Sequence, residues 1–244
     1  MIRRQHVSWH RARVRAVRSE TATARRLDLD VPTWPGNDAG AHLDIRLTAA
    51  DGYQATRSYS IASAGSGTSV VLAVDEVTEG EVSPYLVHTL KAGDEVEIHG
   101  PLGRFFVWVP IDSADPQPVQ LIAGGSGIVP LYAMAAAHDD SNDSSEFRLL
   151  YSVRSPGDVF FRDELTALTR SHVDLVYTRE AAANDARSPG RLTKDLLETL
   201  AFAPHSSPRM FVCGPTPFVE AVSGLLSDLG HDASAIRTER FGGA

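Results

Sequence analysis

Short runs of alternating apolar and polar residues, separated by turn residues, fill the chain up to about residue 110. A period of two is typical of half-buried β-strands, and their regular spacing indicates an antiparallel barrel or sandwich. One short helix interrupts them at "SPYLVHTL". The runs are "RVRAVRS", "ARRLDLDV", "HLDIRLTA", "RSYSIAS", "SVVLAVDEV" and "DEVEIHG". We expect an N-terminal antiparallel β-barrel domain over residues 1–112.

The pattern changes in the second half, where uninterrupted apolar strands alternate with helices. The strands are "PVQLIAG", "FRLLYSV", "VDLVYT", "RMFVCG" and a final "IRTERF". Helices are expected from Pro130 and around "RDELTALTR", "TKDLLETL" and "PFVEAVSGLLSDL". This alternation indicates a doubly wound parallel sheet with helices on both faces. The proline-rich segment "PIDSADPQP" is typical of a linker, so we expect an α/β domain over residues 118–244.

Composition and charge narrow the classes of function. The chain has 244 residues and a net charge of −8, which argues against nucleic-acid binding driven by bulk positive charge. No run of about 18 apolar residues occurs, so we expect no membrane span and a cytoplasmic protein. The single cysteine, Cys213, can form no internal disulfide and cannot supply a cysteine-rich zinc site or an iron–sulfur cluster. The nine histidines are scattered, and we predict no metal site.

A glycine-rich turn, "AGGSGIVP" at residues 123–130, directly follows the first apolar strand of the second half. Such a turn lets backbone N–H groups approach a pyrophosphate, and the next helix offers its positive N-terminus. Pro130 suits the first helical position, where its missing N–H costs nothing. The pattern G-x-G-x-x-P therefore predicts a dinucleotide site, with a purely structural turn as the alternative.

Three other local features carry candidate chemistry. Ser83 is expected to be the N-cap and Pro84 the first residue of a short helix that favours an anion, or simply a well-capped structural helix. Cys213 lies at the carboxyl edge where parallel sheets bind ligands, or is a small buried side chain. In "TRSYSIAS", Arg57 near Tyr59 is unusual for plain strand packing. Two anion-binding helix starts indicate two phosphate-bearing ligands.

Six motifs occur in the order found in one protein family. They are "RSYS" (57–60), "GEVS" (80–83), "GPLGRF" (100–105), "GGSGIVP" (124–130), "CGPTPF" (213–218) and "ERFG" (239–242). With these motifs the chain resembles the ferredoxin–NADP reductase-like flavoproteins over nearly its whole length. It is most similar to the FAD- and NAD(P)H-binding reductase module of bacterial oxygenase reductases, without an iron–sulfur domain. The resemblance implies an FAD-binding barrel followed by an NAD(P)-binding α/β domain.

The resemblance implies a set of FAD contacts in the barrel. Arg57 would pair with the FAD pyrophosphate, Tyr59 would lie along the flavin, and Ser60 would hydrogen-bond near flavin N5. The "GEVS" motif would contact the phosphates, which favours tightly held FAD over FMN. Whether Phe241 stacks on the flavin is left open. The implied FAD-binding residues are Arg57, Ser58, Tyr59, Ser60, Val74, Val77, Gly80, Glu81, Val82, Ser83 and Phe241.

In the α/β domain the resemblance implies a site for the nicotinamide nucleotide. The glycine-rich turn would hold the pyrophosphate, and Cys213 would lie beside the nicotinamide. No acid follows the strand "RLLYSVR" before Asp158, and nearby arginines suit a 2′-phosphate, which favours NADPH with NADH possible. The implied NAD(P)-binding residues are Gly125, Ser126, Gly127, Ile128, Ser152, Arg154, Arg179, Arg191, Cys213, Gly214 and Pro215.

The implied reaction transfers a hydride from NAD(P)H to flavin N5, with Ser60, Cys213 and Glu239 as the catalytic residues that orient the two rings. Because the chain lacks iron–sulfur ligands, the electrons would pass to a separate acceptor, such as a ferredoxin or an oxygenase component. One alternative is a reductase of free flavin or ferric complexes. Another is a non-catalytic nucleotide-binding module that senses redox state. The sequence identifies neither the acceptor nor the oligomeric state.

Overall fold

The computed structural model describes residues 7–111, 113, 116–183 and 185–242 of the chain's 244. The chain divides into two compact units, residues 1–108 (unit 1) and 109–244 (unit 2). The domain end expected at residue 112 lies outside the described residues. Within the described ranges, each unit has its own β-sheet, antiparallel in unit 1 and parallel in unit 2.

Unit 1 is a curled antiparallel sheet with the strand order β4-β3-β6-β1-β2-β5. Ile61, directly after β4, forms a bridge with Leu72 of β5, and the Ala62 N–H donates to the Val71 carbonyl at 2.8 Å. The two end strands therefore meet at one point, which curls the sheet into a barrel. The strands are β1 (Ser8–Ser19), β2 (Ala24–Asp30), β3 (His42–Thr48), β4 (Gln54–Ser60), β5 (Ser69–Asp75) and β6 (Glu95–Leu102).

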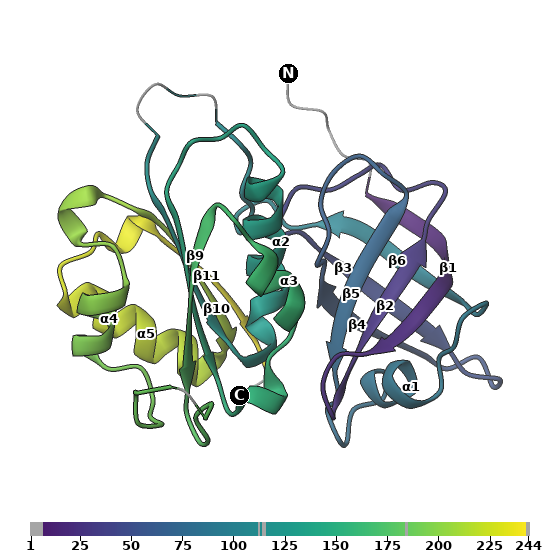
Figure 1. Cartoon of the computed structure of the whole chain (residues 1–244). Coiled ribbons are helices and arrows are strands. Elements are labelled where there is room, and N and C mark those ends of the chain that lie inside the picture. Colours follow the sequence, from purple (N-terminus) through teal and green to yellow (C-terminus); the bar gives the residue numbers. More distant parts are fainter. Residues whose placement is uncertain (1–6, 112, 114–115, 184, 243–244) are drawn as a thin grey trace. The chain divides into compact units, whose positions relative to one another are not determined.

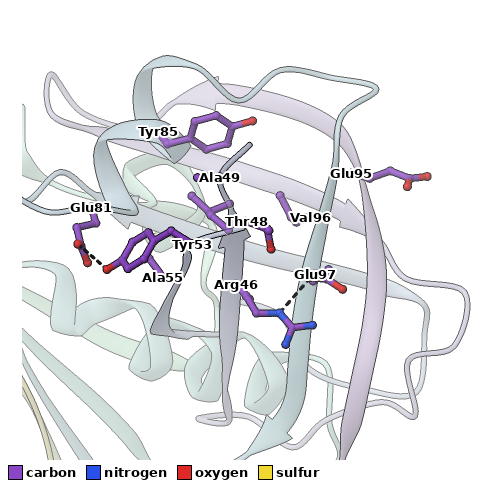
Figure 2. Close-up of a pocket in the computed structure, with 11 residues that line it drawn as sticks. Arg46, Thr48, Ala49, Tyr53, Ala55, Glu81, Tyr85, Glu95, Val96 and Glu97 are labelled. Atoms are coloured by element: carbon purple, nitrogen blue, oxygen red, sulfur yellow. Dashed lines mark hydrogen bonds and ion pairs between the residues drawn. The ribbon is translucent and has the colours of Figure 1, made fainter. Parts of the chain in front are cut away.

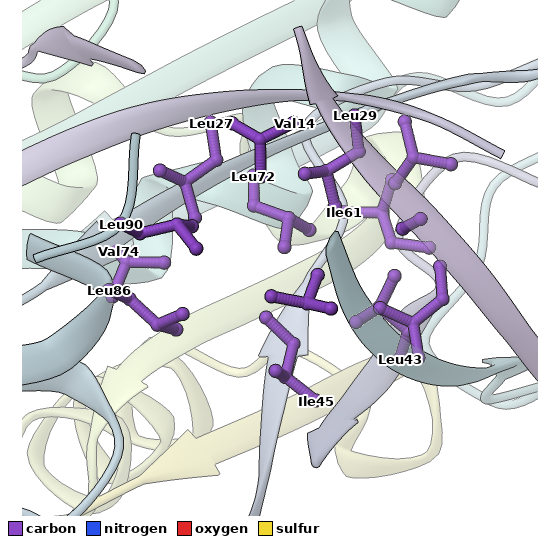
Figure 3. Packing of buried hydrophobic residues seen from close by; sticks show 14 of the residues in the cluster. Val14, Leu27, Leu29, Leu43, Ile45, Ile61, Leu72, Val74, Leu86 and Leu90 are labelled. Carbon is purple, nitrogen blue, oxygen red and sulfur yellow. The ribbon is translucent and has the colours of Figure 1, made fainter. Parts of the chain in front are cut away.

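The interior of unit 1 is filled by the apolar positions of the alternating strands. In β1, Ala12 and Val14 are buried, while their neighbours Arg11 and Arg13 face outward. Figure 3 shows side chains from several strands converging in one cluster, with Leu86 reaching it from the helix α1 (Ser83–His88). Burial of one strand face therefore sets the register of the barrel.

The start of α1 differs from the sequence prediction. The N-cap is Val82, so Ser83 is the first helical residue and Pro84 the second. The Ser83 hydroxyl accepts a hydrogen bond from the Val77 N–H at 3.0 Å and makes no capping bond. The prediction of Ser83 as N-cap is therefore wrong, because the preceding loop uses its oxygen.

Unit 2 is a five-stranded parallel sheet with the order β11-β10-β7-β8-β9. Figure 1 shows α2 and α3 on one face of this sheet and α4 and α5 on the other. The strands are β7 (Val119–Gly124), β8 (Phe147–Val153), β9 (Ser171–Tyr177), β10 (Arg209–Pro215) and β11 (Ile236–Phe241). The helices are α2 (Ile128–Asp139), α3 (Arg162–Ala167), α4 (Lys194–Leu200) and α5 (Thr216–Asp228).

The two layers of helices explain the apolar strands of unit 2. All six residues of β7 are buried, which fits a central strand covered on both faces. The expected fold, an antiparallel barrel followed by a doubly wound parallel α/β sheet, is confirmed. Within the described ranges, no helix is both long and apolar enough to cross a bilayer.

The helix after the glycine-rich turn begins earlier than predicted. Gly125–Gly127 form one 3₁₀ turn, and α2 starts directly after it at Ile128. Pro130 is therefore the third helical residue, and its prediction as the first is wrong. A proline is tolerated there because the N–H groups of the first turn have no intrahelical partner.

Candidate functional site

The glycine-rich turn of unit 2 presents its backbone at the carboxyl end of β7. Gly125 has a φ of +55°, and a Cβ built on it would meet nothing within 4 Å, so this side of the turn is open. Neither the 3₁₀ turn nor α2 receives a side-chain cap from the described residues. The turn is therefore open on this side to a ligand, and glycine-rich turns before a helix are a common place for a pyrophosphate to bind.

Gly127 lies against the end of β10, so close that only glycine fits. A Cβ there would be 2.3 Å from the carbonyl oxygen of Cys213 and 2.7 Å from the backbone nitrogen of Gly214. Real Cβ atoms essentially never approach a neighbour closer than 3.0 Å. The structure therefore brings the predicted residues Gly127, Cys213 and Gly214 together at one edge of the sheet.

A phenyl ring packs beneath the same edge. Cβ atoms built on Gly124 and Gly214 would lie 2.6 Å and 2.7 Å from Cδ1 of Phe218, in the first turn of α5. The ring thus requires glycine at the ends of both β7 and β10. The sequence motif "CGPTPF" contains Phe218, but no local pattern indicates its contact with Gly124.

Cys213 and Glu239 are neighbours across two parallel strands. They are register partners in β10 and β11, and Pro215 pairs likewise with Phe241. Burial raises the pKa of the Cys213 thiol well above its ordinary value, the Glu239 carboxylate adds to the rise, and the Gly214 N–H opposes it. The thiol is therefore a neutral group, suited to positioning a ligand rather than to nucleophilic attack. Phe241 is partly exposed at the strand end.

The predicted arginines gather at the carboxyl ends of β8 and β9. The Arg179 N–H donates to the Arg154 carbonyl at 2.9 Å, so these two exposed residues are adjacent. Arg191 follows Gly190, whose N–H donates to the Tyr177 carbonyl at 2.9 Å. Ser152, the penultimate residue of β8, is buried.

In unit 1, β4 presents its predicted residues on two different faces. Arg57 and Tyr59 stand opposite Ile45 and Leu43, the core-facing residues of β3. Burial raises the pKa of Tyr59 to about 12, although the Arg57 charge opposes this. Ser58 faces away from them, as alternation requires, and its hydroxyl donates to Asp44 at 2.6 Å.

The other predicted FAD residues differ in what they offer a ligand. Val74 and Val82 are fully buried in the barrel core, which leaves only their backbone groups for a cofactor. Val77 is 64% exposed, and the Gly80 N–H donates to its carbonyl at 2.7 Å. Ser60 ends β4 opposite His42.

Arg57 is engaged by an anion of the chain itself. Its guanidinium donates to Glu81 Oε2 at 2.7 Å, and the Tyr53 hydroxyl donates to Glu81 Oε1 at 2.9 Å. Tyr53 and Glu81 lie at one side of a pocket of about 500 Å³, with Tyr85 and Glu95 among its other lining residues (Figure 2). Sequence reasoning missed Tyr53, because nothing local relates it to a loop 28 residues later.

Among the residues that the structure describes, no three His, Cys, Asp or Glu side chains lie where they could hold a metal ion. The absence of a metal centre stays a prediction. Beside the carboxylates of Glu81 and Glu239, the polar groups of the candidate site are arginines, backbone N–H groups and a hydroxyl, all of which can donate hydrogen bonds. These donors suit phosphates and a flavin rather than a cation.

The two units together define a class of protein, one that pairs an FAD-binding barrel with an NAD-binding α/β domain. Residues 12–107 match the family described as "Oxidoreductase FAD-binding domain", and residues 121–224 match "Oxidoreductase NAD-binding domain". The chain belongs to the ferredoxin–NADP reductase-like family of flavoprotein oxidoreductases, as its motifs implied. FAD and a nicotinamide nucleotide are the ligands of these two kinds of domain.

Individual relatives agree with this assignment. The chain is 32% identical over 215 residues to a glycine betaine monooxygenase reductase subunit from Chromohalobacter salexigens, covering 85% of this chain and 56% of the relative. It is 30% identical to NADH-cytochrome b5 reductase 1 from Lodderomyces elongisporus, covering 88% and 72%. The FAD/NAD-binding domain of nitric oxide dioxygenase from Vibrio cholerae matches with a TM-score of 0.82 and 27% identity, covering 96% and 99%. The chain spans about half the length of several curated relatives that it matches.

Proposed function

We propose that this chain is an FAD-dependent NAD(P)H oxidoreductase that takes a hydride from NAD(P)H onto flavin N5 and passes electrons to a separate acceptor. The observation that carries the proposal is the contact of Gly127 with the backbone of Cys213 and Gly214. It supports a nicotinamide site at the carboxyl edge of the sheet, next to a turn open to a pyrophosphate. Bound FAD would supply the electron chemistry, and the protein would supply binding and orientation.

On this proposal the protein's own residues act by position. Arg57 would bind the flavin pyrophosphate, Tyr59 would lie along the flavin, and Ser60 would donate a hydrogen bond near N5. In unit 2, the neutral Cys213 thiol would border the nicotinamide, with Glu239 beside it on β11. None of these groups would form a covalent bond to substrate.

We propose NADPH as the preferred nucleotide. Arg154 and Arg179 are exposed and are joined through their backbones at the sheet edge, and Arg191 lies in the loop tied to Tyr177. Guanidinium groups suit bidentate contacts with a 2′-phosphate, which NADH lacks. NADH remains the competing substrate in the test below.

For the acceptor we propose a separate electron carrier, such as a ferredoxin or an oxygenase component. Support comes from the relatives named as reductase components of a glycine betaine monooxygenase and of a propane 2-monooxygenase. A reductase of free flavin or ferric complexes is the alternative outcome. These two functions differ in whether FAD stays bound through purification.

The visible spectrum of the purified protein tests the proposal. We expect flavin absorption near about 450 nm that bleaches under anaerobic conditions on adding NADPH. In turnover, the kcat/KM for NADPH as electron donor should be higher than that for NADH. A protein that cannot be reconstituted with FAD would overturn the proposal. One that binds FAD and both nucleotides without bleaching would instead be a non-catalytic module.

A further inference from the structure

The arginine assigned to the flavin pyrophosphate already has a negatively charged partner in this structure. Both carboxylate oxygens of Glu81 are used, one by the Arg57 guanidinium at 2.7 Å and the other by the Tyr53 hydroxyl at 2.9 Å. Arg57 also donates to the Thr56 carbonyl at 2.8 Å. Glu81 thus binds the guanidinium, and Tyr53 holds Glu81 in place.

All three side chains are accessible, so their contacts can exchange. The Arg57 side chain is 52% exposed and that of Glu81 is 49% exposed. Tyr53 is 57% exposed. An ion pair at such a surface contributes little to stability, and a stronger anion can replace it at small cost. Glu81 lies in the loop before α1, outside any helix or strand.

The charges indicate whether Glu81 assists or opposes the binding of a pyrophosphate to Arg57. A pyrophosphate that reached Arg57 would carry negative charge to a place where the carboxylate already neutralises the guanidinium. Two anions a few ångströms apart repel each other. Arg57 and Glu81 together present no net charge, so a pyrophosphate gains the full attraction of Arg57 only after Glu81 has moved away.

The geometry points to Glu81 as an internal competitor for the flavin pyrophosphate, held on Arg57 by Tyr53 and released when FAD binds. This inference rests on the proposed function and gives Glu81 a different role from a simple phosphate contact. It also assigns Tyr53 to the flavin site. Glu81 and Tyr53 then set how tightly FAD is held without touching its reactive ring.

If Glu81 instead assisted FAD binding, its replacement would change the FAD affinity in the opposite direction. A carboxylate that orients an arginine for a bidentate phosphate contact would strengthen FAD binding, and its removal would weaken it. A competitor weakens binding, and its removal tightens it. The direction of the change in FAD affinity therefore separates the two roles.

The test is titration of FAD into flavin-free protein, followed by flavin fluorescence, for the wild type, Glu81→Gln and Tyr53→Phe. We expect FAD to bind about two- to fivefold more tightly to Glu81→Gln, the range given by an exposed ion pair. Tyr53→Phe should tighten FAD binding about twofold, because Glu81 loses its second donor. Riboflavin, which has no phosphate, should bind all three proteins equally.

Glu95→Gln is the matched control. Glu95 lines the same pocket and lies on the opposite side of the view from Glu81 in Figure 2, so its replacement removes one negative charge without touching Arg57. Glu81→Gln that binds FAD equally or more weakly than the wild type would overturn the inference. So would an equal gain in Glu95→Gln. A wild type that binds no FAD would instead refute the proposed function.

Discussion

Replacing Gly127 by alanine tests the contact on which the nucleotide site depends. The added Cβ would lie 2.3 Å from the Cys213 carbonyl oxygen, about 1.1 Å short of the 3.4 Å at which ordinary contact begins. The three nearest atoms all belong to the backbone of β10 and cannot rotate away. The turn and the strand must therefore separate by about 1 Å. Overpacking of this kind destabilises a protein by about 1–3 kcal/mol.

Gly127→Ala should lower both the stability of the protein and its rate of flavin reduction. For a chain of this size, 1 kcal/mol corresponds to about 2–4 °C, so Tm should fall by about 2–12 °C. A displacement of about 1 Å at the nicotinamide should slow flavin reduction about 100-fold if the proposed function holds. Calorimetry measures the first effect, and rapid mixing with NADPH measures the second.

Gly224→Ala is the control for the effect of a methyl group alone. Gly224 lies within α5, and a Cβ there would meet nothing within 4 Å. Alanine should leave Tm unchanged or raise it, because glycine is unfavourable inside a helix by about 0.5–1 kcal/mol. If the Tm of Gly127→Ala were no lower than those of the wild type and Gly224→Ala, the close contact of Gly127 with β10 could not be what excludes a side chain there.

Four further results are expected. Arg57→Ala should weaken FAD binding about 10- to 100-fold in calorimetric titration, since a hydrogen bond to a charged group is lost, and an unchanged affinity would contradict its role. At pH 8 iodoacetamide should alkylate Cys213 far more slowly in the folded protein than in urea, because the raised pKa keeps the thiol neutral. Because the pKa of Cys213 is raised, the folded state loses stability as pH rises past the ordinary thiol value of 9.0, where the thiol ionises only in the unfolded chain. Equally fast alkylation would refute the first statement, and a free energy of unfolding in urea that does not fall above pH 9 would refute the second. Replacing Arg154 and Arg179 by alanine should lower the ratio of kcat/KM for NADPH over NADH about tenfold, and a constant ratio would remove them from the 2′-phosphate site.

The periodic features of the chain could be predicted from the sequence. Alternation in β1 and the continuous apolar run of β7 depend on which faces are buried, and burial follows from the residues themselves. The glycine-rich turn could also be located, because its residues are contiguous. These signals gave the order of domains and the edge of the sheet that holds the candidate site.

The parts that failed depend on contacts between distant residues. Ser83 has the right side chain for an N-cap, but the Val77 N–H in the folded loop takes its oxygen. Pro130 fits the first helical position by local statistics, yet the 3₁₀ turn moves the helix start back to Ile128. The contact of Phe218 with Gly124 joins segments with no common periodicity. The sequence alone contains no signal for such contacts.

The same applies to the charged groups around Arg57. Sequence motifs predict the arginine as a phosphate ligand, but they do not show that Glu81 already binds it or that Tyr53 holds Glu81. Both partners are placed by the fold, one before β4 and the other before α1. A motif therefore predicts which residue binds the phosphate, and the structure adds the contacts that this residue already makes.

The position of β4 at the end of the sheet affects how the protein behaves without its cofactor. Within the described sheet β4 pairs with β3, and its other side has only the single bridge that follows at Ile61. An open strand edge invites pairing between molecules. A flavin bound against the open side of this strand, over its backbone groups, would cover that edge. Protein produced with too little flavin should therefore form oligomers or precipitate, and flavin added during expression should raise the yield of monodisperse material.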